Sequence, residues 1–233
     1  MRILYIFPHP DDECFGPAPA IARQLRLGHE VHLLTLTRGG ATRQRHRLGL
    51  SVREMGELRY REMLDVESTL GLTGMTVLDL PDSGLAEMDP RDIETPIRER
   101  IRDLEPDVVV TYAVHGVSGF PDHLVSHAVV KRVFCELRAE DGGPRRLALF
   151  TLQGGDRSEG KFPLRSSSDD AIDAAEAYSE GDLERAKRAL ACYVSYHEVI
   201  EEARPLEEIG DAVHFEFFQE SFDPWGDSIV EGL

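Results

Sequence analysis

The sequence has 233 residues and lacks the features of several protein classes. It has no apolar run of about eighteen residues, and no basic start leads into an apolar stretch, so we expect neither a membrane span nor a secretory signal. Cysteine is scarce: Cys14, Cys135 and Cys192 stand at unrelated spacings, which does not suit a disulfide framework. The protein is therefore expected to be cytoplasmic.

Positive charge is also in short supply, because 26 basic residues face 43 acidic ones and the formal net charge is −17. A surface of that sign repels nucleic acid and anionic lipid, so we expect neither as a partner. The length favours one domain, residues 1–233, over two. A homo-oligomer is compatible with the sequence, which does not set the number of subunits.

Short apolar runs alternate with helical patterns along the chain. Strands are predicted at residues 3–7, 31–37, 75–80, 107–114 and 147–152, with an edge strand at 213–218. Helices are predicted from Pro19 to Gly28 and at residues 52–70, 93–104, 123–137 and 182–200. This alternation predicts an α/β fold, a Rossmann-like doubly wound and mostly parallel sheet of order 3-2-1-4-5 with helices on both faces.

The one long polar stretch, Gly154–Asp170, lies between the strand predicted at 147–152 and the helix predicted at 182–200. It is either a mobile loop or a lid over a site.

The most informative segment follows the first predicted strand. One imidazole and three carboxylates stand together in Phe7-Pro8-His9-Pro10-Asp11-Asp12-Glu13. Gly16-Pro17-Ala18-Pro19 cannot continue a regular helix, so the acids lie in a loop. Adjacent buried carboxylates raise one another's pKa unless a cation neutralises them. The segment is either a solvated acidic turn or part of a metal site, for which it offers two of the three ligands of a catalytic zinc.

A second cluster follows the fourth predicted strand and contains the missing imidazole. His123 comes after Pro121-Asp122, and His127 lies one helical turn further on. In strand order 3-2-1-4-5, strands one and four are neighbours at the switch point, and ligands bind beyond the carboxyl ends of the strands there. We therefore expect the two clusters to meet, with His123 as the metal ligand of the second.

Several neighbouring residues have ordinary interpretations beside the functional one. His127 more often packs or caps inside its helix than binds metal. Cys14 can ligate zinc, although a small buried cysteine is commoner. Asp122 either orients an imidazole ligand or stabilises the helix start. A nucleotide-binding fold would need a glycine-rich turn after the first strand, where this chain has acids and prolines that repel phosphate.

The sequence resembles the PIG-L/LmbE-like zinc-dependent de-N-acetylases, which act on N-acetylglucosaminyl conjugates. The resemblance runs over most of the chain, and its first and last motifs are the most specific. It is carried by His9-Pro10-Asp11-Asp12-Glu13, Leu36-Thr37-Arg38-Gly39-Gly40, Gly56-Glu57-Leu58-Arg59 with Glu62, Leu70-Gly71, Asp82-Ser83-Gly84-Leu85 and Pro121-Asp122-His123.

This resemblance implies that His9, Asp12 and His123 bind zinc and that Asp11 is the general base. Asp12 can coordinate while Asp11, pointing elsewhere, reaches a water whose pKa zinc lowers from about 15.7 toward roughly 7. Attack on the acetamide carbonyl then yields acetate and a free amino sugar, with Asp11 passing the proton to the amine. A His-Asp-His site also accepts iron or other divalent ions.

The chain departs from the family pattern at one position. Many members carry His-Pro-Asp-His, whose first histidine assists the oxyanion or leaving group, and this chain has Phe120 there. Either His115, in the same glycine-containing loop, substitutes, or Asp11 makes both proton transfers. Loss of such a group typically costs about 10²–10⁴ in rate. A catalytically impaired metal- or sugar-binding protein and a hydrolase of another amide are therefore alternatives.

An arginine-rich stretch begins at the carboxyl end of the second predicted strand. Residues 38–61 hold seven arginines against two glutamates. Arginine suits bidentate recognition of carboxylate or phosphate, so we expect a small amino-sugar substrate with an anionic aglycone, contacted by Arg38, Arg43 and Arg59. The alternative is ion pairing on a helix surface.

Overall fold

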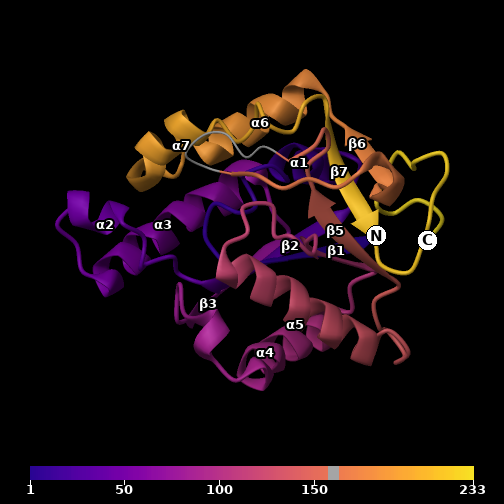
Figure 1. Ribbon diagram of the computed structural model, residues 1–233, viewed down its shortest axis with the longest axis horizontal. Coiled ribbons are helices and arrows are strands. Elements are labelled where there is room, and N and C mark those ends of the chain that lie inside the picture. Colours follow the sequence, from indigo (N-terminus) through magenta and orange to yellow (C-terminus); the bar gives the residue numbers. More distant parts are fainter. Residues whose placement is uncertain (157–162) are drawn as a thin grey trace.

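The computed structural model describes residues 1–156 and 163–233, and within them the chain is built around a seven-stranded sheet (Figure 1). The strand order is β3-β2-β1-β4-β5-β7-β6. The first five strands are parallel and confirm the predicted order 3-2-1-4-5. The strands are β1 (Arg2–Phe7), β2 (Glu30–Thr37), β3 (Gly74–Leu80), β4 (Val108–Tyr112), β5 (Arg146–Thr151), β6 (Ala174–Ala177) and β7 (Ala212–Phe217).

The strand predicted at 213–218 is present as β7, but its predicted position at the edge is wrong, because β7 lies inside the sheet. It pairs antiparallel with β5 on one side and with β6 on the other. The edge strand β6 has the sequence Ala-Ala-Glu-Ala, which lacks the β-branched and aromatic residues that mark a strand. Its position therefore comes from tertiary pairing and not from local propensity.

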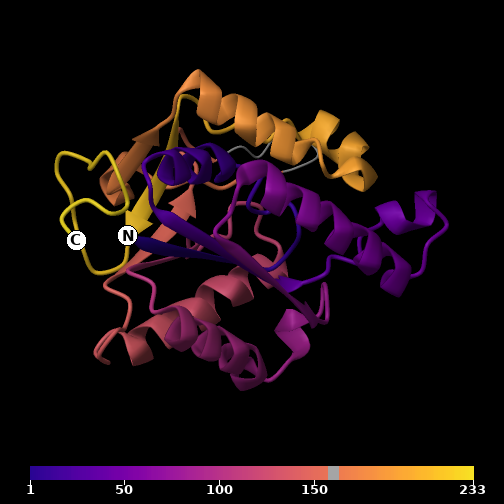
Figure 2. The same cartoon turned by 180° about the vertical axis from the view of Figure 1, so that it is seen from behind.

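Helices cover both faces of the sheet, as predicted (Figure 2). Ile3, Tyr5 and Phe7 of β1 pack on one face with α1, α3 and α6, while Leu4 and Ile6 pack on the other with α4 and α5. This alternation is the period of a strand buried on both sides. The helices are α1 (Ala18–Arg26), α2 (Gln44–Arg47), α3 (Val52–Leu70), α4 (Pro90–Leu104), α5 (Pro121–Leu137), α6 (Glu180–Leu190) and α7 (His197–Ala203), with 3₁₀ turns η1 (Leu85–Glu87), η2 (Asp169–Ala171) and η3 (Val194–Tyr196).

Helix α3 begins and ends where the sequence predicts. Ser51 and Glu54 form a reciprocal capping box at its start, and Gly71 ends it with φ of 73°. The single helix predicted over 182–200 is wrong, because the chain leaves α6 after Leu190 and starts α7 at His197. Between the two helices, Tyr193 and Ser195 are buried; Tyr193 contacts Glu13 in the loop after β1, and Ser195 contacts Glu62 of α3.

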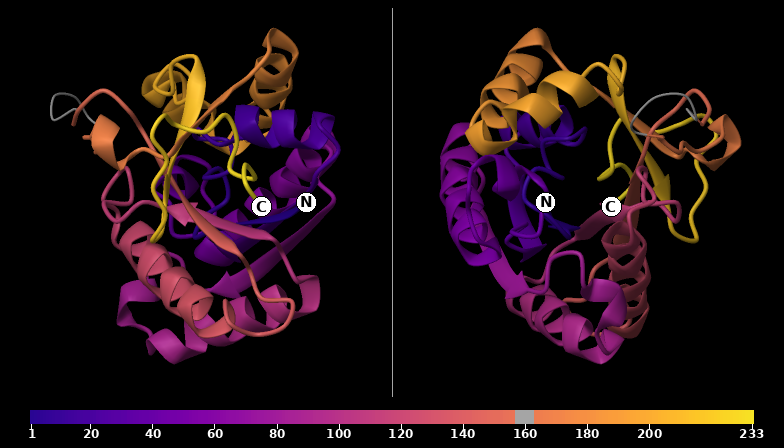
Figure 3. Two further views of the ribbon diagram at one scale, coloured as in Figure 1. Left: turned by 90° about the vertical axis from the view of Figure 1, so that its right-hand side faces the viewer. Right: turned by 60° about the vertical axis from the view of Figure 1, so that its left-hand side comes forward.

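Figure 3 shows the two helical layers on either side of the sheet. No described helix is long and apolar enough to cross a membrane. Residues 157–162 of the predicted loop or lid lie outside the described residues. Beyond them, the backbone N–H of Arg165 donates to the carbonyl of Val117 at 2.7 Å, so this part of the chain contacts the loop after β4.

Candidate metal and catalytic site

The candidate site lies at the ends of β1 and β4, between the loop after β1 and the first turn of α5, which holds Asp122 and His123. These two strands are hydrogen-bonded neighbours, with Tyr5 of β1 opposite Val110 of β4. Their carboxyl ends therefore meet at one edge, and the structure brings the two predicted clusters together. One donor atom from each of His9, Asp12 and His123 lies within 4.8 Å of the others.

His123 is held so that one ring nitrogen faces Asp12. Its Nδ1 lies 2.9 Å from the Gly116 carbonyl oxygen and 3.1 Å from the Ser118 hydroxyl. Because a carbonyl oxygen only accepts, Nδ1 carries the proton. Its Nε2 then points a lone pair at Asp12 Oδ1, 3.3 Å away. Two acceptor atoms at that distance need a cation or a proton between them, so the donor set fits a metal ion.

Tyr112, at the end of β4, supports both of these ligand candidates. Its hydroxyl donates to Asp12 Oδ1 at 2.7 Å. Its ring stacks on the His123 imidazole, with centroids 4.3 Å apart and planes at 10°. Sequence analysis does not predict a role for Tyr112. Its position at the carboxyl end of β4, where ligands bind in this fold, could have indicated one.

His9 is surrounded by carboxylates. Its backbone N–H donates to Asp12 Oδ2 at 2.8 Å. Its Nε2 lies 3.2 Å from Asp122 Oδ2 and 3.4 Å from Asp82 Oδ1, which leaves Nδ1 toward Asp12, 3.5 Å away. Although burial lowers the pKa of His9, hydrogen bonds to Asp12 and Asp122 raise it to about 10. Burial opposes the charge of Asp12 as well, but His123 and His9 hold its pKa well below the usual range.

Asp122 therefore orients His9 and not its sequence neighbour His123. Its carboxylate also accepts the backbone N–H groups of Ser83 at 2.8 Å and Leu85 at 3.3 Å. Asp82 plays a similar part, because it accepts the Ala41 N–H at 2.6 Å. His9, Asp82 and Asp122 form a second group of donors within 4.8 Å. This second group holds one imidazole where the first holds two, so we take the first group as the candidate metal donors and interpret Asp82 and Asp122 as supports that fix the His9 ring.

Asp11 is held by a buried arginine. Its φ of 88° is in the left-handed region, which aspartate tolerates better than most residues. Its Oδ2 accepts from Arg59 Nη2 at 2.7 Å, and the same nitrogen donates to the Pro10 carbonyl at 2.7 Å. Asp11 Oδ1 accepts no hydrogen bond from the residues that the structure describes. Burial raises the pKa of Asp11 to about 6, although Arg59 lowers it.

The three arginines predicted to contact substrate have different surroundings. Arg59 is 2% exposed, and its guanidinium lies 4.1 Å from the Tyr196 ring centroid, so it is enclosed by protein. Arg38 forms an ion pair with Glu57 at 2.5 Å. Arg43 is exposed and has no ion-pair partner among the described residues.

The rest of the loop after β4 also departs from the predicted roles. His115 faces Thr151 and Ser167, whose hydroxyls each lie 3.3 Å from its Nε2, and no ring nitrogen of His115 contacts the His9–Asp12–His123 cluster. Phe120 is 55% exposed and meets His123 edge-on, with centroids 5.6 Å apart.

Two other residues follow their ordinary interpretations. His127 Nδ1 contacts the Tyr112 carbonyl at 2.9 Å, inside the fold. Cys14 is buried, and burial raises the pKa of its thiol.

The segment between α6 and α7 adds residues that sequence reasoning missed. The Tyr193 hydroxyl donates to Glu13 Oε1 at 2.5 Å. Burial raises the pKa of Glu13 to about 7, although this hydrogen bond lowers it. Ser195 donates its N–H and its hydroxyl to Glu62, both at 2.7 Å. No local motif marks these contacts, because about 130 to 180 residues of chain separate the partners.

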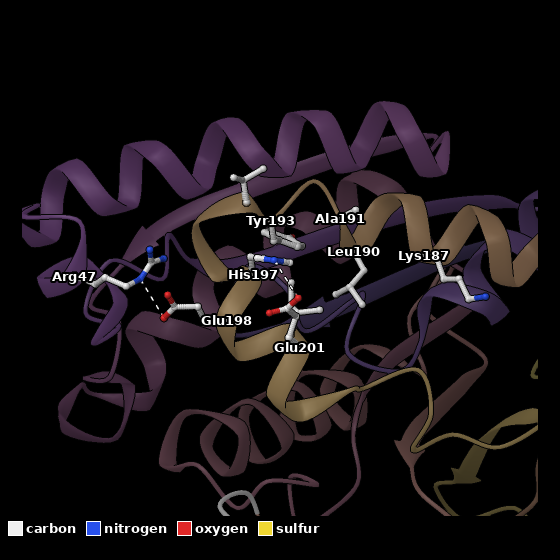
Figure 4. Close-up of a pocket in the computed structure, with 10 residues that line it drawn as sticks. Arg47, Lys187, Leu190, Ala191, Tyr193, His197, Glu198 and Glu201 are labelled. Atoms are coloured by element: carbon white, nitrogen blue, oxygen red, sulfur yellow. Dashed lines mark ion pairs between the residues drawn. The ribbon is translucent and has the colours of Figure 1, made fainter.

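A cavity of about 420 Å³ lies on the outer side of this segment (Figure 4). Its walls include Leu190, Val194 and Ile200. The charges at its rim are paired, Arg47 with Glu198 at 3.3 Å and His197 with Glu201 at 3.2 Å. None of the candidate metal donors lines it, so the chemistry is expected at the cluster and not in this cavity.

Comparisons with known proteins find a family model and relatives that match this chain. The family model PIG-L, described as GlcNAc-PI de-N-acetylase, matches residues 4–134. A 1D-myo-inositol 2-acetamido-2-deoxy-alpha-D-glucopyranoside deacetylase of Kineococcus radiotolerans is 32% identical over 168 residues, 60% of this chain and 46% of the relative. The N-acetylglucosaminyl-phosphatidylinositol de-N-acetylase of Bos taurus is 28% identical over 202 residues, 83% of this chain and 74% of the relative.

Among solved structures, the N,N'-diacetylchitobiose deacetylase of Pyrococcus horikoshii superposes with a TM-score of 0.70 at 17% identity. The match covers 93% of this chain and 83% of that one, and it supports the fold. The chain spans about half the length of the bacterial inositol-glycoside deacetylases that it matches.

Proposed function

The chain belongs to the PIG-L family, and from this premise we propose that it is a metal-dependent hydrolase that removes the N-acetyl group from an N-acetylglucosaminyl conjugate. The observation that carries the proposal is the meeting of His9, Asp12 and His123 beside the buried Asp11. A fold alone does not set an activity, so the argument rests on these side chains.

The proposed metal ligands are His9 through Nδ1, Asp12 through its carboxylate and His123 through Nε2. Imidazole and carboxylate donors suit zinc, and iron is the alternative ion. When bound, the ion supplies Lewis-acid chemistry, lowering the pKa of a water and polarising the acetamide carbonyl. Asp122 and Asp82 on one ring, and the Gly116 carbonyl on the other, keep the two imidazoles in the required tautomers.

Asp11 is the proposed general base. Arg59 fixes its Oδ2, so the free Oδ1 is the atom that takes the proton from the attacking water. The new bond joins the water oxygen to the acetamide carbon, and the bond from that carbon to nitrogen then breaks. The same Asp11 oxygen returns its proton to the departing nitrogen, which leaves acetate and a free amino sugar.

We assign both proton transfers to Asp11, because the other candidate donor is engaged elsewhere. His115 is hydrogen-bonded to Thr151 and Ser167, and Phe120 has no proton to give. A second function, binding of a metal and sugar without efficient turnover, is favoured by this same absence of a donor at residue 120.

The proposed aglycone is anionic, and Arg43 is the arginine best placed to contact it. The backbone N–H of Ala41 donates to Asp82, and Asp82 contacts His9. Ala41 therefore lies beside the site, and Arg43 follows it by two residues. Arg43 is exposed and carries an unpaired charge among the described residues. Arg59 and Arg38 are committed to Asp11 and Glu57.

Acetate release from a panel of N-acetylglucosaminides, measured with zinc, with iron and after chelation, tests the proposal. We expect turnover that chelation abolishes and that zinc or iron restores. Bound metal without turnover on any member would support the binding protein instead. Turnover that survives full removal of the metal would contradict the proposed mechanism.

A further inference from the structure

We infer that His115 is a positioning residue for the metal ligand His123. It holds the strained backbone turn that aims the Gly116 carbonyl at His123. Through Ser167 and Glu216 it ties this turn to strand β7. The inference rests on the proposed function, because it takes His123 as a metal ligand.

The turn that orients His123 has an unfavourable backbone. Gly116 and Val117 have φ of 63° and 56°. Glycine adopts this region freely, but a β-branched residue such as Val117 rarely does. In this conformation the Gly116 carbonyl lies 2.9 Å from His123 Nδ1. Such a backbone persists only where its surroundings fix it, so the contacts around Val117 decide where the carbonyl points.

Both backbone polar groups of Val117 have partners. Its N–H donates to His115 Nδ1 at 3.1 Å, and its carbonyl accepts the Arg165 N–H at 2.7 Å. Because Nδ1 of His115 accepts, the proton of the neutral ring is on Nε2. Removing this imidazole would leave the buried Val117 N–H without its acceptor.

The Nε2 proton of His115 starts a chain of hydrogen bonds. Thr151 and Ser167 each place a hydroxyl 3.3 Å from Nε2, and these hydroxyls lie 2.6 Å from each other. Ser167 donates to Glu216 Oε1. A carboxylate only accepts, so the Ser167 proton goes to Glu216, and the Ser167 oxygen can accept from Thr151 or from His115. The Leu152 carbonyl, 3.2 Å from the Thr151 hydroxyl, is a second acceptor for Thr151. Thr151 and Ser167 are 1% and 7% exposed, which shields the network from competing water.

The network spans two parts of the chain that the sequence does not link. His115 and His123 lie within the residues that the family model matches, 4–134, whereas Thr151, Ser167 and Glu216 lie beyond them. Glu216 sits on β7 opposite Leu149 of β5, so the last link is anchored in the sheet. The geometry of the metal ligand thus depends on residues outside the matched segment.

The test compares His115→Ala with His32→Ala in the full chain. His32 is a buried histidine on β2, where it lies opposite Leu4 of β1 and Gly74 of β3 and outside the His115 network. The Zn²⁺ dissociation constant, measured by competition with a chromophoric chelator, should rise about 10–100-fold in His115→Ala and stay unchanged in His32→Ala. Amide hydrogen exchange at Val117 should quicken in His115→Ala alone.

Ser167→Ala provides a second variant that keeps the imidazole. Its Zn²⁺ dissociation constant should also rise, by a smaller factor than that of His115→Ala. Zn²⁺ binding by His115→Ala as tight as that of the unaltered chain would overturn the inference, and so would equal losses in both histidine variants. If the unaltered chain bound no Zn²⁺ or Fe²⁺, the proposed function itself would fail, which separates the two outcomes.

Discussion

The segment that matches the family model, residues 4–134, and the segment from β5 onward contribute to the site in different ways. The first supplies the candidate metal ligands and Asp11. Among the described residues, the second supplies none of these groups and instead supplies partners for the charges and loops of the first: Tyr193 for Glu13, Ser195 for Glu62, Tyr196 for Arg59, and Ser167 with Glu216 for His115.

This difference shows how a site rich in buried charge is held. A carboxylate taken from water is costly unless it is hydrogen-bonded or paired. The later segment provides several of those partners from residues far away along the chain. Substitutions in the first segment should therefore remove chemistry, and substitutions in the second should loosen the site while leaving its chemistry in place.

The largest effect is expected for Asp11→Asn. The variant keeps the shape of the side chain but cannot take a proton from water, so kcat for acetate release should fall by about 10²–10⁴. Steady-state kinetics at saturating zinc measures the loss. Asp82→Asn is the control for removing a charge near His9 without removing the base. A kcat for Asp11→Asn near that of the unaltered chain would end the assignment of Asp11.

Arg59→Gln tests whether the arginine supports Asp11. It leaves a buried carboxylate without its partner, and breaking such a pair costs about 3–5 kcal/mol. Urea unfolding should show a loss of that order, together with reduced kcat. Arg61→Gln, an exposed position on the same helix, is the matched control. Equal stabilities of the two variants would show that Arg59 is not a structural partner of Asp11.

Phe120→His asks whether the site lacks a proton donor. The side chain lies beside His123 at the exposed edge of the site, so an imidazole there should raise kcat, by up to about 10²-fold. Phe120→Leu serves as the control for loss of the aromatic ring. Unchanged or lower kcat in Phe120→His would instead favour a site adapted to work without that donor.

Ser195→Ala probes the later segment. It removes the hydroxyl that donates to the buried Glu62, and a hydrogen bond to a charged group is worth about 1.5–3 kcal/mol. Thermal or urea unfolding should show that loss, with metal content unchanged. Ser168→Ala, at an exposed serine, is the control. If Ser195→Ala were as stable as the unaltered chain but lost its metal, the different roles assigned to the two segments would be wrong.

Arg43→Ala should have the smallest effect. An exposed charge contributes about 0.2–1 kcal/mol to a pair, so KM for anionic N-acetylglucosaminides should rise a few-fold at most while KM for neutral ones stays constant. Equal KM changes for neutral and anionic substrates would remove the reason to propose an anionic aglycone.

Local patterns were enough to predict the parallel core and the meeting of the two clusters. The strongly apolar β1 and β4, the stop at Gly71 and the switch-point rule place His9 near His123 without any structure. They also predict a loop for the acids, because the prolines beyond Gly16 exclude a regular helix.

The supports escaped prediction because their partners are distant in sequence and carry no motif. Tyr193 meets Glu13 only after the chain has left α6, and an alanine-rich helical pattern hides that break. The sequence predicts that Arg59 contacts substrate, because an exposed and a buried arginine look alike in a sequence. Only the fold shows that its charge is matched to Asp11.

The most direct test of the account is the metal content of three proteins, measured by mass spectrometry after loading with zinc and removal of free ions. The unaltered chain and Asp11→Asn should each hold one zinc ion per chain, and His123→Ala should hold none. Zinc retained by His123→Ala, or no zinc in the unaltered chain, would contradict the claim that the loop after β1 and the first turn of α5 meet around a metal ion.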